Sequence, residues 1–210
     1  MTKIRVIIVE DHLLTRVGLR FILDDSTNLK VIDEAEDGLS GFQKVVELVP
    51  DIALLDIGLP VIDGIECLTR IRQAKLPTRV MIRSSHAEDA AILAAIAAGA
   101  DGYCLKDSPD QLLIAGLEYI HGGKAWLDPR IAGQMATAFS PYLNRSRQPS
   151  NGIISSSSRP SFVLDEADLA TLNQIATSTD DSGRSEPLNA ATSNTDPIRL
   201  IMQKISNRKI

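Results

Sequence analysis

Five polar residues capable of chemistry stand at the ends of short apolar stretches of this sequence. They are Glu10 and Asp11, Asp56, Ser84, and Lys106. Each apolar stretch is only a few residues long and is bounded by turn-forming residues, which predicts buried strands rather than helices. Because the carboxyl ends of parallel strands lie at one edge of an α/β sheet, we expect these five side chains to meet there.

The chemistry expected at this edge is phosphoryl transfer. Carboxylates that crowd together repel one another unless a cation joins them, and oxygen ligands alone favour a hard ion such as Mg²⁺. With a metal ion, the Lys106 ammonium and the Ser84 hydroxyl around it, the Asp56 carboxylate is suited to carry a phosphoryl group as the nucleophile. The predicted metal ligands are Glu10, Asp11, Asp56 and the backbone carbonyl of Gly58.

Each of these residues has a plainer explanation when it is taken singly. An aspartate after a strand is more often a turn cap, and Glu10-Asp11 could cap the helix that begins near His12. Lys106 could be an ordinary surface lysine, and Ser84 a hydroxyl at a strand end. All of them occur in phase with predicted strands, however, and this joint occurrence favours the functional interpretation.

The elements that must position these residues follow from the periodicity of residues 1–123. Short aliphatic runs predict five strands, at residues 4–9, about 31–32, 52–55, 79–84 and 102–105. Between and after them, apolar residues at helical spacing predict five helices. The helical stripes are Leu14, Val17 and Phe21; Phe42, Val45, Val46 and Val49; Ile65, Leu68 and Ile71; the alanine-rich segment 88–98; and Leu113, Gly116, Leu117 and Ile120. The alternation predicts a doubly wound α/β fold with a parallel sheet.

Composition excludes several other classes of protein. Of the 210 residues, 44% are hydrophobic, and no apolar stretch approaches the length of a membrane span. The formal net charge is −5, without the strongly basic balance that announces nucleic-acid binding. Cys67 and Cys104 show neither metal nor disulfide spacing, which suits a reducing compartment. We therefore expect a cytoplasmic protein that does not associate with membranes.

The motifs together resemble the receiver domain of a two-component response regulator. The segments that carry the resemblance are Val9-Glu10-Asp11-His12, Leu55-Asp56-Ile57-Gly58-Leu59-Pro60 with Asp63-Gly64, Ser84-Ser85-His86, and Gly102-Tyr103-Cys104-Leu105-Lys106. The resemblance covers residues 3 to about 123. It implies a flavodoxin-like fold with five strands in the order 2-1-3-4-5, and a signalling protein rather than an enzyme.

The same resemblance assigns roles to individual residues. It implies that Asp56 accepts a phosphoryl group from a sensor histidine kinase, with Mg²⁺ as the cofactor. It also implies that Lys106 binds the phosphoryl group, and that Ser84 and Tyr103 form a switch on the partner-binding face. Arg83 departs from the pattern, because the family usually has an apolar residue there; the side chain could reach the surface or touch the switch face. The alanine-rich helix 87–98 offers a smooth surface for a partner, including a second copy of the chain.

The remainder of the chain is less regular. We expect a receiver domain at residues 1–123, a connector helix at 124–143, a serine-rich linker at 144–161 and a partly disordered region at 162–210. Helical periodicity recurs at residues 164–176 and 198–205, and resembles the first and the recognition helix of a degenerate LuxR-type (NarL-type) helix-turn-helix. Between them the apolar scaffold helix of that family is missing, so specific DNA binding is not expected.

The sequence leaves two outputs open for a regulator and raises two functions of other classes. The regulator could act on transcription through the degenerate helix-turn-helix, or only through protein contacts of the receiver. A Mg²⁺-dependent phosphohydrolase would also use an aspartyl phosphate, but such enzymes usually carry a second acid two residues after the nucleophile, and here that residue is Gly58. A nucleotide- or flavin-binding module would need a glycine-rich phosphate loop after a strand, which the sequence lacks.

Overall fold

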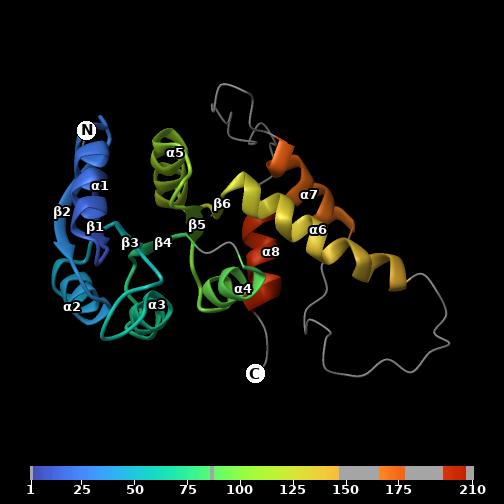
Figure 1. Ribbon diagram of the computed structural model, residues 1–210, viewed down its shortest axis with the longest axis horizontal. Coiled ribbons are helices and arrows are strands. Elements are labelled where there is room, and N and C mark those ends of the chain that lie inside the picture. The colour runs from blue at the N-terminus through green and yellow to red at the C-terminus, as the bar shows by residue number, and fades with distance from the viewer. Residues whose placement is uncertain (1, 86–87, 147–165, 178–195, 207–210) are drawn as a thin grey trace.

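The computed structural model describes residues 2–85, 88–146, 166–177 and 196–206, with only the backbone described at 138–146 and 197. A parallel sheet forms its centre, with strands in the order β2-β1-β3-β4-β5-β6 (Figure 1). The strands are β1 (Ile4–Val9), β2 (Leu29–Ala35), β3 (Ile52–Leu55), β4 (Arg79–Ser84), β5 (Gly102–Leu105) and β6 (Trp126–Leu127). The predicted parallel α/β fold and the order of the first five strands are confirmed.

The expected number of five strands is wrong by one. A sixth strand, β6, pairs in parallel with β5 through Gly102–Trp126 and Tyr103–Leu127. It lies within residues 124–143, which were expected to form a connector helix. A strand of two residues is too short to show a hydrophobic period in the sequence. It becomes visible only through its pairing with β5 in the structure. The connector helix itself, α6 (Pro129–Ser146), begins directly after this strand.

Helices cover both faces of the sheet. One face packs against α2 (Gly38–Leu48), α3 (Gly64–Gln73) and α4 (Asp89–Ala97), and the other against α1 (Leu13–Asp25) and α5 (Asp110–His121). Side chains alternate along each strand, so Ile7 and Val9 face the first layer while Val6 and Ile8 face the second. Among the described residues, no helix is both long and apolar enough to cross a membrane.

Helix α1 is present as expected, but its apolar stripe faces outward. Leu14 and Phe21 are each 75% exposed and Val17 is 54% exposed. The buried residues of this helix are Arg16, Leu19 and Leu23. Periodicity found the helix, but it could not tell which of two apolar faces the sheet would take.

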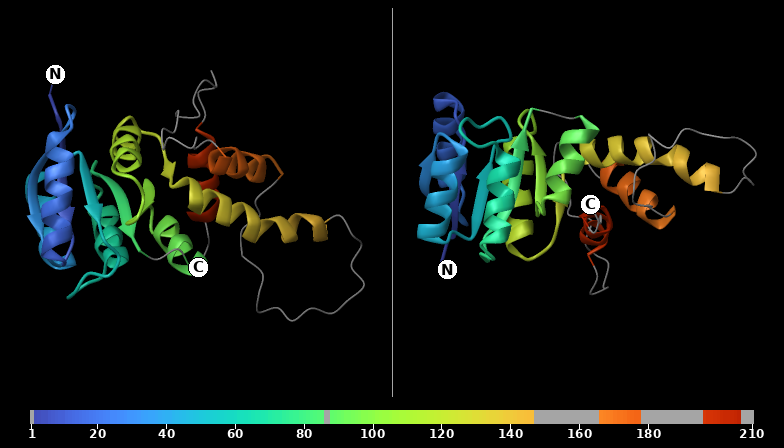
Figure 2. Two further views of the ribbon diagram at one scale, coloured as in Figure 1. Left: turned by 45° about the horizontal axis from the view of Figure 1, so that its top comes forward. Right: turned by 90° about the horizontal axis from the view of Figure 1, so that it is seen from below.

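The helices expected at residues 164–176 and 198–205 are observed as α7 (Glu166–Thr177) and α8 (Pro197–Ser206). Figures 1 and 2 show α6 running away from the sheet with α7 alongside it, and α8 lying next to α4. Leu172, Ile201 and Ile205 are buried in the same apolar cluster as the receiver core. The two helices therefore share a core with the receiver. The expected linker and disordered segments fall largely outside the described residues, and the domain boundaries stay predictions.

Candidate functional site

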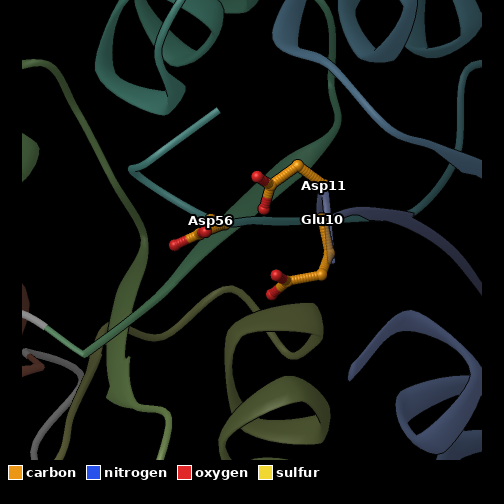
Figure 3. Close-up of side chains that lie close together, drawn as sticks. All are labelled: Glu10, Asp11 and Asp56. Carbon is orange, nitrogen blue, oxygen red and sulfur yellow. The ribbon is translucent and has the colours of Figure 1, made fainter. Parts of the chain in front are cut away.

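Three carboxylates converge at the carboxyl edge of the sheet, as the sequence indicated. Glu10 and Asp11 follow β1, and Asp56 follows the neighbouring strand β3. One oxygen of each lies within 4.8 Å of one oxygen of the other two (Figure 3). Glu10 is 2% exposed and Asp56 8% exposed, whereas Asp11 is open to solvent. Two of the three charges are thus largely withdrawn from water.

The backbone around Asp56 is fixed by close contacts. The Asp56 amide donates to the Val9 carbonyl across 2.9 Å, and the Ile57 amide donates to Asp56 Oδ1 across 2.7 Å. A Cβ atom on Gly64 would stand 1.9 Å from the Asp56 carbonyl oxygen, so this position admits only glycine. Asp63 caps α3 by accepting from the Glu66 amide. The Asp63-Gly64 pair therefore lets α3 begin directly beneath the acidic residue.

Lys106 is the cation of the site. Its Nζ lies 2.9 Å from Asp56 Oδ2 and 2.8 Å from Glu10 Oε2, and its backbone amide donates to the Ser84 carbonyl. Partial burial disfavours the ammonium, but the hydrogen bonds to Glu10 and Asp56 outweigh this and raise the pKa of Lys106. One ammonium against three carboxylates leaves two negative charges uncompensated. The all-oxygen donor set and this excess charge fit a divalent cation.

Ser84 and Tyr103 lie together behind the carboxylates, on β4 and β5. Both residues are completely buried. Burial raises the pKa of Tyr103 to about 12, and a side-chain hydrogen bond with Ser84 acts in the opposite direction. The structure therefore holds the tyrosine ring inside, linked to the serine hydroxyl, rather than on the surface.

Gly58 lies beside the Asp56 carboxylate, and the predicted role of its carbonyl as a metal ligand stays a prediction. A Cβ atom at this position would stand 3.7 Å from Asp56 Oδ2, at ordinary van der Waals distance. The position is exposed and carries no acid. Apart from Tyr103, which lies within β5, the residues predicted for the site thus come from the loops and strand ends at one edge of the sheet.

Sequence reasoning missed Arg16, which organises the acidic pair. Arg16 is 9% exposed, and its Nη1 donates to the Glu10 carbonyl across 2.6 Å and to the Asp11 carbonyl across 3.3 Å. Its Nε also lies 3.3 Å from the Glu34 carboxylate. The only available signal was an arginine one turn into a helix that follows two acids. Such a residue is usually a solvated charge.

A second network missed from sequence joins the turn after Lys106 to α6. Asp128, fully buried, accepts hydrogen bonds from the Ser108 hydroxyl and from the Leu105 and Arg130 amides. Arg130 in turn forms a bidentate pair with Asp107, at 2.8 and 2.9 Å. The turn after Lys106 and the first turn of α6 are therefore one hydrogen-bonded unit.

An open parallel sheet with an acidic cluster and a lysine at its carboxyl edge defines a receiver. Residues 6–118 match the family model described as "Response regulator receiver domain". The chain belongs to this family, and it is a two-component response regulator.

The curated relatives belong to the NarL/LuxR group of regulators. The chain is 32% identical to "Probable transcriptional regulatory protein NarL" of Mycobacterium tuberculosis over 78% of this chain and 79% of that protein. It is 27% identical to "Oxygen regulatory protein NreC" of Staphylococcus carnosus over 82% of this chain and 76% of the relative. The solved receiver domain of the NarL regulator from Mycobacterium tuberculosis superposes with a TM-score of 0.58 at 35% identity, covering 59% of this chain and 100% of that one. These relatives are regulators, in agreement with the expectation of a signalling protein rather than an enzyme.

Proposed function

We propose that the chain is switched by phosphorylation of Asp56 by a sensor histidine kinase. The observation that carries the proposal is the position of Lys106 Nζ, within hydrogen-bonding distance of both Asp56 and Glu10. In the transfer, an Asp56 carboxylate oxygen forms the new bond to phosphorus. The bond from phosphorus to the donor breaks, and its electron pair leaves with the donor group. Lys106 stabilises the charge on the phosphoryl oxygens throughout.

Mg²⁺ is the proposed cofactor. The carboxylates of Glu10, Asp11 and Asp56 and the carbonyl of Gly58 would hold it, and the ion would offset the repulsion between the acidic cluster and an incoming phosphate. The uncompensated charge of the cluster supports this assignment. Ser84 and Tyr103 are proposed to change conformation on phosphorylation. The Ser84 hydroxyl would turn toward the phosphoryl group, and the Tyr103 side chain would move with Ser84.

The exposed apolar stripe of α1 supports a protein as the phosphoryl donor. Leu13 and Leu14 follow Asp11 closely in the chain, and Val17 and Phe21 continue the stripe along the helix. A protein that brings a phosphohistidine to Asp56 would meet this surface first. We assign α1 to contact with the kinase.

The proposal is tested by incubating the full-length protein with acetyl phosphate. With MgCl₂ present, the expected result is one phosphoryl group per chain, found by intact mass spectrometry and mapped to the peptide that contains Asp56. Replacing MgCl₂ with EDTA should reduce the rate of labelling by at least about 10-fold, since the carboxylates then repel the donor. Equal labelling with and without the metal would contradict the Mg²⁺ assignment. Labelling confined to another residue would contradict the acceptor assignment.

A phosphohydrolase is the rival function, and Gly58 argues against it. Enzymes that turn over an aspartyl phosphate need an acid or base near the leaving group. The exposed Gly58 occupies the position, two residues after Asp56, where such enzymes usually carry that acid. Rapid release of inorganic phosphate from a generic phosphomonoester would favour the enzyme.

We propose further that the phosphorylated regulator acts through contacts with other proteins rather than through DNA binding. Lys204 of α8 pairs with Asp168 of α7 at 2.6 Å, and Arg199 reaches the buried Asp101 at 3.3 Å. Two of the basic residues that could contact DNA phosphates are thus engaged within the protein. Helix α8 also packs against the alanine-rich α4, so a homodimer through the part of α4 that α8 contacts would require α8 to move.

A gel-shift comparison separates this output from the transcriptional alternative. The full-length protein and residues 1–140 are each mixed with a pool of duplex DNA of random sequence, before and after acetyl phosphate treatment. The expected result is equal, weak retardation by both at 50 mM salt, since Arg199 and Lys204 of α8 are already paired with acidic residues of the protein. Retardation by the phosphorylated full-length protein alone, lost as salt is raised, would restore DNA binding.

A further inference from the structure

Arg83 of β4 makes a contact with the phosphoryl-site lysine that no motif requires. Its Nη2 donates to the backbone carbonyl of Lys106 across 2.8 Å. Its Nη1 is buried and has no hydrogen-bond partner in the part of the chain that the structure describes. The arginine therefore neither extends freely into solvent nor satisfies all its donors.

Two consecutive residues of β4 bond the backbone N–H and the backbone C=O of Lys106. The Ser84 carbonyl accepts from the Lys106 amide across 2.9 Å, and the Arg83 guanidinium donates to the Lys106 carbonyl. The ammonium of the same residue bridges Asp56 and Glu10. Lys106 directly follows β5 at the start of a turn, where no ladder bond fixes its carbonyl. Arg83 replaces that missing bond.

Stability does not explain an arginine at this position. Side chains alternate along β4, so the half-buried Arg83 leaves the sheet on the same side as Met81, a member of the apolar cluster beneath α1 and α5. An apolar side chain there would pack without a buried donor, whereas an unpartnered guanidinium nitrogen costs free energy. A residue that costs stability and touches a functional residue is more readily explained by function.

We propose that Arg83 is a positioning residue for Lys106, and that it speeds phosphoryl transfer to Asp56 by fixing the backbone from which the ammonium reaches. The inference rests on the proposed function of Asp56. The planar fork of arginine suits this role, because one nitrogen can bond the carbonyl while the other end of the group stays packed. A lysine at this position has one donor group and a shorter reach.

The test compares Arg83→Met and Arg83→Lys with the wild type, using acetyl phosphate and MgCl₂. For Arg83→Met the maximal rate of Asp56 labelling should fall roughly 3- to 10-fold, the effect of one lost hydrogen bond of ordinary strength. The concentration of acetyl phosphate at half-maximal rate should hardly change, since the ground-state site is intact. The urea midpoint should stay the same or rise. Arg83→Lys should recover part of the rate.

Arg5→Met is the matched control. Arg5 also donates to backbone carbonyls, those of Val49 and Leu48 at 3.0 and 2.9 Å, but it lies at the opposite edge of the sheet. Its replacement should lower the urea midpoint and leave the labelling rate unchanged.

A second test is the double variant of Arg83→Met with Lys106→Met. If Arg83 acts through Lys106, the double variant should label as slowly as Lys106→Met and no slower.

The outcomes are distinguishable. Failure of the wild type to label at Asp56 would remove the proposed function, and the inference with it. Normal labelling of Arg83→Met would overturn the role of Arg83 and leave Asp56 as the acceptor. Slower labelling accompanied by a lower urea midpoint, or by additive loss in the double variant, would mean that Arg83 is merely structural.

Discussion

Asp56→Asn should abolish labelling by acetyl phosphate and leave the fold intact. The amide nitrogen and carbonyl oxygen of asparagine are too weak as nucleophiles to attack phosphorus, so the expected fall in rate is at least about 100-fold. The change preserves the shape of the side chain and the acceptor for the Ile57 amide. It also removes one of three carboxylates that repel one another. The measurement is intact mass after incubation with acetyl phosphate and MgCl₂, with a urea unfolding curve alongside.

Asp63→Asn is the matched control for this change. The chemistry of the substitution is identical, and Asp63 caps α3 a few residues further along the chain. Asparagine caps a helix about as well as aspartate, so both the stability and the labelling of this variant should stay near those of the wild type. Full labelling of Asp56→Asn would mean that another group, such as Asp11, is the acceptor.

Asp101→Ala should be the most destabilising single change at the opposite edge of the sheet. The Asp101 carboxylate is 8% exposed and accepts from Arg72 at 2.6 Å, from Arg79 at 2.9 Å and from the Val80 amide at 2.9 Å. Arg199 of α8 adds a fourth contact at 3.3 Å. Its removal leaves partly buried guanidinium groups facing one another without a counter-charge. The expected loss is about 3 kcal/mol or more in the free energy of unfolding.

Urea unfolding at neutral pH measures this loss, and hydrogen exchange of residues 197–206 tests a second consequence. Because Arg199 connects α8 to Asp101, the amides of α8 should exchange faster in Asp101→Ala. Asp110→Ala is the control, since Asp110 is exposed in the first turn of α5. It should cost less than about 1 kcal/mol through the helix dipole. Equal, small losses in both variants would show that the arginine cluster contributes little to folding.

The site was predictable because its residues are placed by strand ends, and strand ends are visible in sequence. Asp56 and Lys106 each follow an apolar run that stops at a charge, and the parallel topology then brings them to one edge. No comparable rule covers Arg16 or Arg83. Their side chains donate hydrogen bonds to backbone carbonyls. Every residue type has a backbone carbonyl, so the sequence does not show which residue will be the acceptor.

The fold was predictable for a similar reason, and the exceptions are physical. The short strand β6 forms because β5 offers an unpaired edge. It could not be predicted from the sequence, because two residues are too few to show a hydrophobic period. Helix α1 has two apolar faces, and either of them could pack on the sheet. Which face is buried depends on packing against the sheet and cannot be read from the periodicity of the helix. The C-terminal helices were expected within a partly disordered region. The sequence did not show that Leu172 and Ile205 could be buried against the receiver.

The hydrogen-bonded unit of Asp107, Ser108, Asp128 and Arg130 gives α6 the geometry of a lever. The unit holds α6 by hydrogen bonds at the first turn of the helix. The rest of the 18 residues of α6 run away from the sheet (Figure 2). At a rise of 1.5 Å per residue the helix is about 27 Å long, so a tilt of about 5° at the gripped end would displace the far end by roughly 2 Å. Helix α7 lies along this arm and would be carried with it. A motion too small to disturb the packing around Lys106 would thus be enlarged at the end of α6.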